Sequence, residues 1–96
     1  FAGDAEMVEL VQEFVQELPR RVEALQGLLR ASHFDELRRA AHQLKGAAGG
    51  YGFPTISDSA GKVENLLHSG VDQAQISDLQ NRVDELTRLC GRAVAA

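Results

Sequence analysis

The sequence of 96 residues is poor in cysteine and aromatic residues: it contains one cysteine, no tryptophan, one tyrosine and four phenylalanines. A single cysteine, Cys90, excludes an internal disulfide framework, and its place on an apolar helical stripe predicts a buried thiol in a reducing compartment. The chain has no signal peptide and no apolar run that could span a membrane, so we expect a cytoplasmic protein without a membrane partner. Its length predicts one domain, residues 1–96, with a single core.

The chain also lacks a dominant basic face, a strand-like pattern and a phosphate-binding loop. Its formal net charge of −4 argues against a nucleic-acid partner, because phosphate contacts need a large basic surface. No segment alternates with period two, so we expect no β-sheet. Without a glycine-rich phosphate cradle, the chain should neither bind nor hydrolyse ATP. Because it begins at Phe1 and not at methionine, we expect part of a longer protein or a trimmed product.

What the sequence does contain is apolar residues at alternating steps of three and four, which predict four amphipathic helices. With short connections, these predict an all-α fold, an up-down antiparallel four-helix bundle. The expected buried stripes are Val8, Val11, Val15, Leu18, Val22, Leu25 and Leu29; then Phe34, Leu37, Ala41, Leu44, Ala48 and Tyr51; then Ile56, Ala60, Val63 and Leu67; and finally Ile76, Leu79, Val83, Leu86, Cys90 and Ala93.

Local signals predict where these helices begin and end. The first helix should run from about residue 4 to about residue 31, and Pro19 should kink it or split it in two. A capping box of Ser32 and Asp35 should start the second helix, which the glycines at 49, 50 and 52 then end. The third should start at Pro54 and end near Gly70. The fourth should be capped by the residues at 72 and 75.

One histidine of the predicted second helix lies outside its apolar stripe. At about 100° per residue, His42 falls roughly 130° from the centre of the stripe and should face solvent or the edge of the bundle. Two glycines of this helix, Gly46 and Gly49, each lower the helix stability by about 1 kcal/mol relative to alanine, which calls for an explanation. Close approach by a large anionic molecule would be one. The face of His42 carries basic residues and glycines: Arg38, Arg39, Lys45, Gly46 and Gly49.

The segment His42-x-Leu44-Lys45-Gly46-Ala47-Ala48-x-x-x-Gly52 resembles the motif of histidine-containing phosphotransfer (HPt) domains. The resemblance covers nearly the whole chain and is specific from residue 39 to residue 52. In that family, the histidine exchanges a phosphoryl group with the aspartate of a response-regulator receiver domain. The resemblance therefore implies that His42 is the phosphoacceptor of a two-component phosphorelay, in a carrier that is not an enzyme and needs no cofactor.

Two further residues are predicted to assist His42. Lys45 can favour the neutral imidazole and contact the phosphohistidine oxygens; otherwise it is an ordinary solvated lysine. Glu64 follows the buried Val63, so it can reach the far nitrogen of His42 and fix its tautomer; otherwise it is a plain surface glutamate. The phosphotransfer domain of chemotaxis kinases is similar here, with a glutamate at this separation and a Gly-x-Gly-Phe segment matched by residues 50–53.

The expected receiver contact is formed by one face of the second helix and the start of the third. It comprises Arg38, Arg39, Lys45, Gly49, Thr55 and Asp58, and Gly46 leaves room for the phosphoryl group. Gly46 could instead mark a tight helix crossing. His33 and His68 are interpreted as surface residues, and their spacing predicts no metal site.

Two alternatives stay open from the sequence. The chain could be the phospho-accepting domain of a chemotaxis-type or hybrid histidine kinase, whose ATP-binding catalytic domain would then be a second partner. It could also be a helical adaptor with a degenerate site. Phosphate acceptance by His42, and the donor that supplies it, would discriminate among the three.

Overall fold

The computed structural model describes residues 2–93, with side chains from residue 5 on, and residues 1 and 94–96 lie outside it. The described residues form four helices: α1 (Ala2–Arg30), α2 (Phe34–Gly50), α3 (Pro54–His68) and α4 (Ile76–Gly91). No β-strand occurs within residues 2–93. The predicted all-α class with four helices is confirmed, whereas both ends of the predicted domain 1–96 fall outside the described residues.

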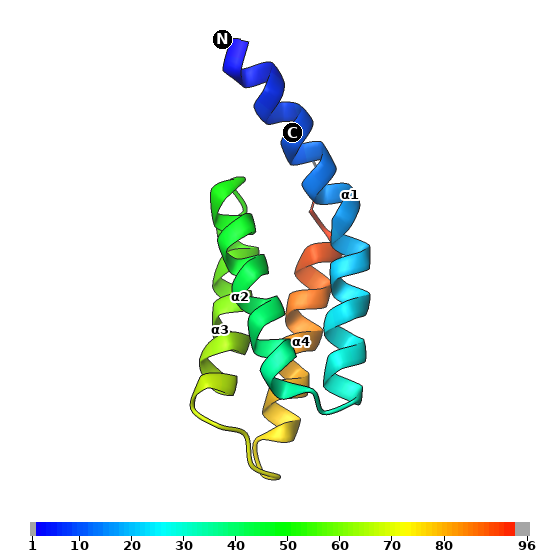
Figure 1. The fold of residues 1–96 in the computed structure, drawn as a ribbon, viewed down its shortest axis with the longest axis vertical. Coiled ribbons are helices and arrows are strands. Elements are labelled where there is room, and N and C mark those ends of the chain that lie inside the picture. The colour runs from blue at the N-terminus through cyan, green and yellow to red at the C-terminus, as the bar shows by residue number, and fades with distance from the viewer. Residues whose placement is uncertain (1, 94–96) are drawn as a thin grey trace.

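The four helices close into a bundle in which each helix packs against its neighbours in the chain and α1 also packs against α4 (Figure 1). The α1–α2 and α3–α4 connections lie at one end, and the α2–α3 connection lies at the other (Figure 1). Such alternation is typical of an up-down antiparallel bundle. The core between the helices is built from Phe14, Leu18, Val22, Leu25, Leu37, Ala41, Leu44, Ala48, Ile56, Ala60, Val63, Leu67, Leu79, Val83, Leu86 and Cys90.

Helix α1 runs through Pro19 without interruption. The prediction that Pro19 splits this helix is therefore wrong, and a kink there stays a prediction. Pro19 is exposed, so the carbonyl that loses its hydrogen-bond donor to the proline can be satisfied by water. The buried neighbour Leu18, 1% exposed, keeps this turn attached to the core.

The apolar stripe predicted for α1 is buried only from the middle of the helix onward. Val8 is 44% exposed, and Met7 and Leu10 are exposed beside it. The first turns of α1 extend past the ends of the other helices (Figure 1), so the prediction that Val8 is a core residue is wrong. Three further positions of this stripe, Val11, Val15 and Leu29, are half-buried, and so are three positions of the other predicted stripes: Phe34, Tyr51 and Ala93.

Phe14, which the predicted stripe omits, closes this end of the core. It is 3% exposed, and its ring centroid lies 5.2 Å from that of Tyr51 and 5.6 Å from that of Phe53. These distances are typical of attractive aromatic pairs. The α2–α3 connection is thereby attached to α1, which fixes the end of α2 relative to the bundle.

The α1–α2 connection does not contain the predicted capping box. Ser32 adopts a left-handed conformation, φ 58°, and the N-cap residue of α2 is His33, which makes no side-chain capping bond. The amides of Ser32 and His33 instead donate to the carbonyls of Leu29 and Leu28, at 3.1 and 2.9 Å. This is a Schellman motif, so Ser32 terminates α1 and does not start α2.

The other helix ends follow their local signals more closely. Gly52, φ 86°, follows α2, and Gly70, φ 88°, follows α3. The predicted reciprocal bonds of Asp72 and Gln75 are present: each backbone amide donates to the other side chain, at 3.2 and 3.1 Å. Helix α4 nevertheless begins only at Ile76. Ile76 is 41% exposed at that end of the bundle, so its predicted place in the core is wrong.

Candidate functional site

His42 lies in the middle of α2 with its side chain turned away from the core. Its side chain is 70% exposed, because the core-facing positions of this turn are taken by Ala41 and Leu44, which are 0% and 1% exposed. The two buried residues hold the backbone of α2 in place, while the imidazole can be reached from solvent. The orientation agrees with the helical geometry expected from the sequence.

Glu64 of α3 contacts His42 of α2. The distance between His42 Nδ1 and Glu64 Oε2 is 2.6 Å. The Glu64 side chain is only 17% exposed, and the preceding residue, Val63, is fully buried. The predicted contact is therefore present, although it tests neither residue's chemical role.

Lys45 completes a chain of three interacting side chains. Its Nζ lies 3.9 Å from the second carboxylate oxygen of Glu64, Oε1, and its side chain is 48% exposed. One oxygen of Glu64 thus faces the imidazole and the other faces a cation. The hydrogen bond to His42 and the cation near the second oxygen both favour this orientation of the carboxylate.

This geometry selects one form of the imidazole. An ionised carboxylate is only an acceptor, so the ring nitrogen in the bond, Nδ1, carries the hydrogen and donates it to Glu64. In the neutral ring the other nitrogen, Nε2, then holds the free electron pair. His42 therefore has a nucleophilic nitrogen and a solvent-exposed side chain.

Two α3 residues of the site were not predicted from the sequence. Ser57 Oγ donates a hydrogen bond of 2.9 Å to the backbone carbonyl of Lys45, and the Lys45 side chain lies over Gly61. Together with Glu64, they occupy positions separated by four and three residues, which align on one face of a helix. This spacing is the only sign of the site that the sequence of α3 contains. It cannot be interpreted without knowing which residues of α2 lie opposite.

The structure places the predicted docking residues of α2 around His42. Arg38 and Arg39 lie one turn before it and Gly46 lies one turn after it, and a Cβ atom at Gly46 would meet nothing within 4 Å. Gly46 is thus open and is not a tight helix crossing. A Cβ atom at Gly49 would lie 3.4 Å from Ser57 Oγ, so this glycine also accommodates α3.

The two predicted docking residues at the start of α3 are exposed but face away from Glu64. Thr55 is nine residues before Glu64, which corresponds to a rotation of about 180° around the helix. Asp58 is six residues before it, a rotation of about 120° from Glu64. Ser57 is the residue of this turn that faces α2.

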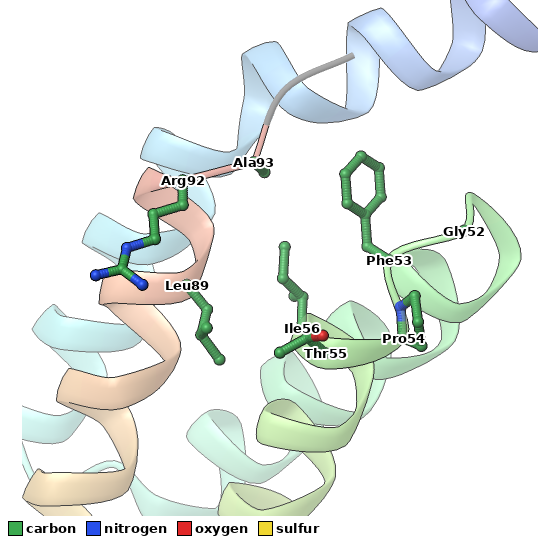
Figure 2. A pocket seen from close by; sticks show the side chains of 8 residues that line it. All are labelled: Gly52, Phe53, Pro54, Thr55, Ile56, Leu89, Arg92 and Ala93. Atoms are coloured by element: carbon green, nitrogen blue, oxygen red, sulfur yellow. The ribbon is translucent and has the colours of Figure 1, made fainter. Parts of the chain in front are cut away.

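Thr55 belongs instead to a separate cavity of about 370 Å³ between the start of α3 and the end of α4 (Figure 2). The walls are mainly apolar, and Figure 2 shows Phe53, Ile56 and Leu89 around the opening, with Arg92 at the α4 side. His42 and Glu64 do not line it. The cavity is therefore not part of the His42 site.

The remaining histidines and the cysteine lie elsewhere. His33 Nδ1 is 3.9 Å from the carboxylate of Glu36 at the start of α2, and His68 is exposed in the last turn of α3. Cys90 is 6% exposed in the core, and burial raises the pKa of its thiol to about 11. A thiol in this state is a poor nucleophile.

Two searches of the described part of the chain gave negative findings. Within residues 5–93, no three histidine, cysteine, aspartate or glutamate side chains are grouped closely enough to hold a metal ion. None of the four helices, over the range described, combines the length and the apolar character needed to cross a membrane.

Comparison with known proteins gives one match. The family model described as Hpt domain matches residues 9–96, which is most of the chain and includes the three interacting side chains of the site. Comparisons with curated proteins and with solved structures returned no match. With a helical bundle that presents His42 on its surface, and a family match over nearly its whole length, the chain belongs to the Hpt domain family.

Proposed function

We propose that residues 1–96 form a single phosphocarrier domain in which His42 accepts a phosphoryl group from the aspartate of a response-regulator receiver domain and returns it to such an aspartate. The family supports the broader part of this proposal, because Hpt domains are phosphocarriers of phosphorelays and not catalytic enzymes. The observation that carries the finer part is the 2.6 Å hydrogen bond from the exposed His42 to Glu64.

The chemistry follows from this bond. The electron pair of Nε2 attacks the phosphorus of the receiver's aspartyl phosphate, an N–P bond forms, and the bond from phosphorus to the aspartate oxygen breaks. Its electron pair stays on the aspartate carboxylate. Nδ1 keeps its hydrogen, and positive charge that develops on the ring is stabilised by Glu64. The reverse reaction uses the same groups, as a carrier requires.

Charge around His42 supports phosphoryl binding. Arg38, Arg39 and Lys45 surround it on the face of α2, whereas the whole chain has a formal net charge of −4. A local cluster of cations attracts the dianionic phosphoryl group and stabilises it after transfer. The same cluster is too small to favour a nucleic-acid duplex.

We infer that the receiver docks on the α2 face that carries Arg38, Arg39, Gly46 and Gly49, with α3 contributing around Ser57. Asp58, farther round α3, can contact only the edge of such a partner, and Thr55 faces the other side of α3. The exposed, side-chain-free surface at Gly46 lets the partner backbone approach the imidazole closely. The complex should be transient and modest in area.

We place the domain in the cytoplasm, where receiver domains and kinases would reach it. The chain has no phosphate-cradling sequence, so an ATP-binding catalytic domain of a histidine kinase would have to be a separate partner or another part of the same protein. In the second case His42 would be the phospho-accepting site of a chemotaxis-type or hybrid kinase. No observation on the described residues favours that case over the simple carrier.

The deciding experiment is phosphorylation with radiolabelled donors. The domain is incubated with a panel of phosphorylated receiver domains and, separately, with a histidine kinase and ATP. Wild type is compared with His42→Gln and with two matched controls, His33→Gln and His68→Gln. We expect label on wild type and on both controls but not on His42→Gln, and the label should be acid-labile and alkali-stable.

The donor that works distinguishes the remaining alternatives. Label from a phosphorylated receiver supports the carrier, and label only from the kinase supports a phospho-accepting kinase domain. If the folded wild type takes no label from any donor, the proposal is wrong and the helical adaptor becomes the better interpretation.

A further inference from the structure

Gly61 is buried in the middle of α3. Glycine lowers the stability of a helix at such a position, because it leaves the backbone more conformational freedom to lose on folding. A Cβ atom placed there would lie 3.6 Å from both Cδ and Cε of Lys45 and 3.9 Å from its Nζ. A Cβ atom alone would make ordinary contacts there, but the space beyond it, which a larger side chain would need, is taken by the stem of Lys45, which reaches across from α2.

The other glycines show that this arrangement is specific. A Cβ atom at Gly27, Gly46, Gly50 or Gly91 would have nothing within 4 Å. Among the helical glycines of residues 5–93, only Gly49 and Gly61 face another side chain, and both lie where α2 meets α3.

We propose that Gly61 is a positioning residue of the His42 site: because no side chain longer than a Cβ atom projects from this position, it leaves a shelf on which the Lys45 stem lies, and this keeps the Lys45 ammonium beside Glu64. The proposal rests on the proposed function, since it assigns Gly61 a part in the reactivity of His42. Gly61 itself touches neither the imidazole nor the phosphoryl group and acts through Lys45.

The contacts of Lys45 with α3 support this role. Its backbone carbonyl accepts the hydrogen bond from Ser57 Oγ at 2.9 Å, its stem packs on Gly61, and its Nζ lies 3.9 Å from Glu64 Oε1. A lysine has four rotatable bonds, and one that is 48% exposed would otherwise extend into solvent. The shelf at Gly61 restricts it to the side of Glu64, whose other oxygen holds His42.

The test replaces Gly61 by valine, whose two methyl groups would occupy the space of the Lys45 stem. Gly61→Ala is the conservative variant, because 3.6 Å is an ordinary contact for a Cβ atom. Gly27→Val is the matched control in a helix away from the site. The rate of His42 phosphorylation is measured with phosphoramidate, a small phosphodonor that needs no protein docking.

We expect Gly61→Val to react about fivefold more slowly, the rate equivalent of losing the contact of one half-exposed cation. Gly61→Ala and Gly27→Val should react at the wild-type rate. In a Lys45→Met background, Gly61→Val should cause no further loss, because the residue through which it acts is already absent. An equal loss in both backgrounds, or no loss in either, would overturn the proposal.

A second measurement does not depend on phosphorylation or on the stability of the valine variant. In wild-type protein, proton NMR should show a nuclear Overhauser contact between the Hα atoms of Gly61 and the Hδ or Hε atoms of Lys45. If this contact is absent, Lys45 does not pack on Gly61 and the proposal is refuted, even if phosphotransfer occurs. If the contact is present but wild type accepts no phosphate, the proposed function fails and the packing of Lys45 stands.

Discussion

Replacement of Glu64 is the sharpest test of how His42 is activated. Glutamine keeps the shape of the side chain and can still accept a hydrogen bond from Nδ1 through its carbonyl oxygen, but it carries no charge. Alanine removes both the charge and the acceptor. Comparing the two variants separates the electrostatic contribution of Glu64 from its role in holding the tautomer.

The expected magnitude follows from the exposure of the pair. A hydrogen bond to a charged group contributes about 1.5–3 kcal/mol and a neutral one about 0.5–1.5 kcal/mol. His42 is 70% exposed, so water competes and the lower values apply. Glu64→Gln should slow phosphorylation of His42 about fivefold, and Glu64→Ala should slow it about tenfold.

The assay is the initial rate of label transfer from a phosphorylated receiver, together with 15N NMR of the imidazole. Wild type should show the hydrogen on Nδ1, and Glu64→Ala should show a mixture of the two tautomers. Glu36→Gln is the matched control, because Glu36 approaches His33 at 3.9 Å on the exposed surface. The melting temperature should fall by no more than about 4–8 °C, since losing this surface contact of His42, which is 70% exposed, costs at most about 1 kcal/mol of stability.

Two results would refute this account of His42. If both Glu64 variants stay folded and react within about twofold of the wild-type rate, the carboxylate does not activate the imidazole. If Glu36→Gln slows the reaction as much as Glu64→Gln does, the effect reflects overall charge and not the hydrogen bond.

Four further predictions address the surface, the core and the first turns of α1. Gly46→Gln should slow transfer from a receiver without lowering the melting temperature, whereas the same change at Gly27 should affect neither; equal losses of transfer and stability would contradict a docking role. Leu44→Ala should lower the free energy of unfolding by about 2–5 kcal/mol, measured in urea, because Leu44 is 1% exposed; a smaller change would mean that the site collapses around the smaller side chain. Burial raises the pKa of the Cys90 thiol from 9.0 to about 11, so alkylation of Cys90 at pH 8 should be about a hundredfold slower in native protein than in urea; equal alkylation rates would show that the thiol is accessible. The free energy of unfolding should also fall as pH rises from 9 towards 11, because the thiol of the unfolded chain loses its proton at lower pH than the thiol of the folded chain. Deletion of residues 1–8 should leave the melting temperature unchanged, because Met7 and Val8 are exposed; a clear decrease would reveal a contact of this segment.

The sequence was sufficient for the exposure of His42 and for two of the helix ends. The exposure of His42 follows from its angle to the stripe of Leu37, Ala41 and Leu44, and the ends of α2 and α3 follow from glycines. The periodicity could not reveal where the partner helices stop, so Val8 and Ile76 were assigned to a core that does not extend to them.

The rest of the site depends on how two helices are placed against each other. Ser57 and Gly61 have unremarkable neighbours in the sequence, and their roles appear only when α3 lies in a particular rotation against Lys45. Ser32 shows a related difficulty. Serine is a common N-cap residue, but here it ends the preceding helix, because the last carbonyls of α1 require hydrogen-bond donors.

The alignment of Ser57, Gly61 and Glu64 has a consequence for how the domain can vary in evolution. A single inserted or deleted residue between Gly61 and Glu64 would turn the carboxylate by about 100° around α3 and remove it from His42. The same insertion in the α3–α4 connection would leave both side chains in place. Changes in the length of the chain should therefore be confined to the connections, where loops absorb them at little thermodynamic cost.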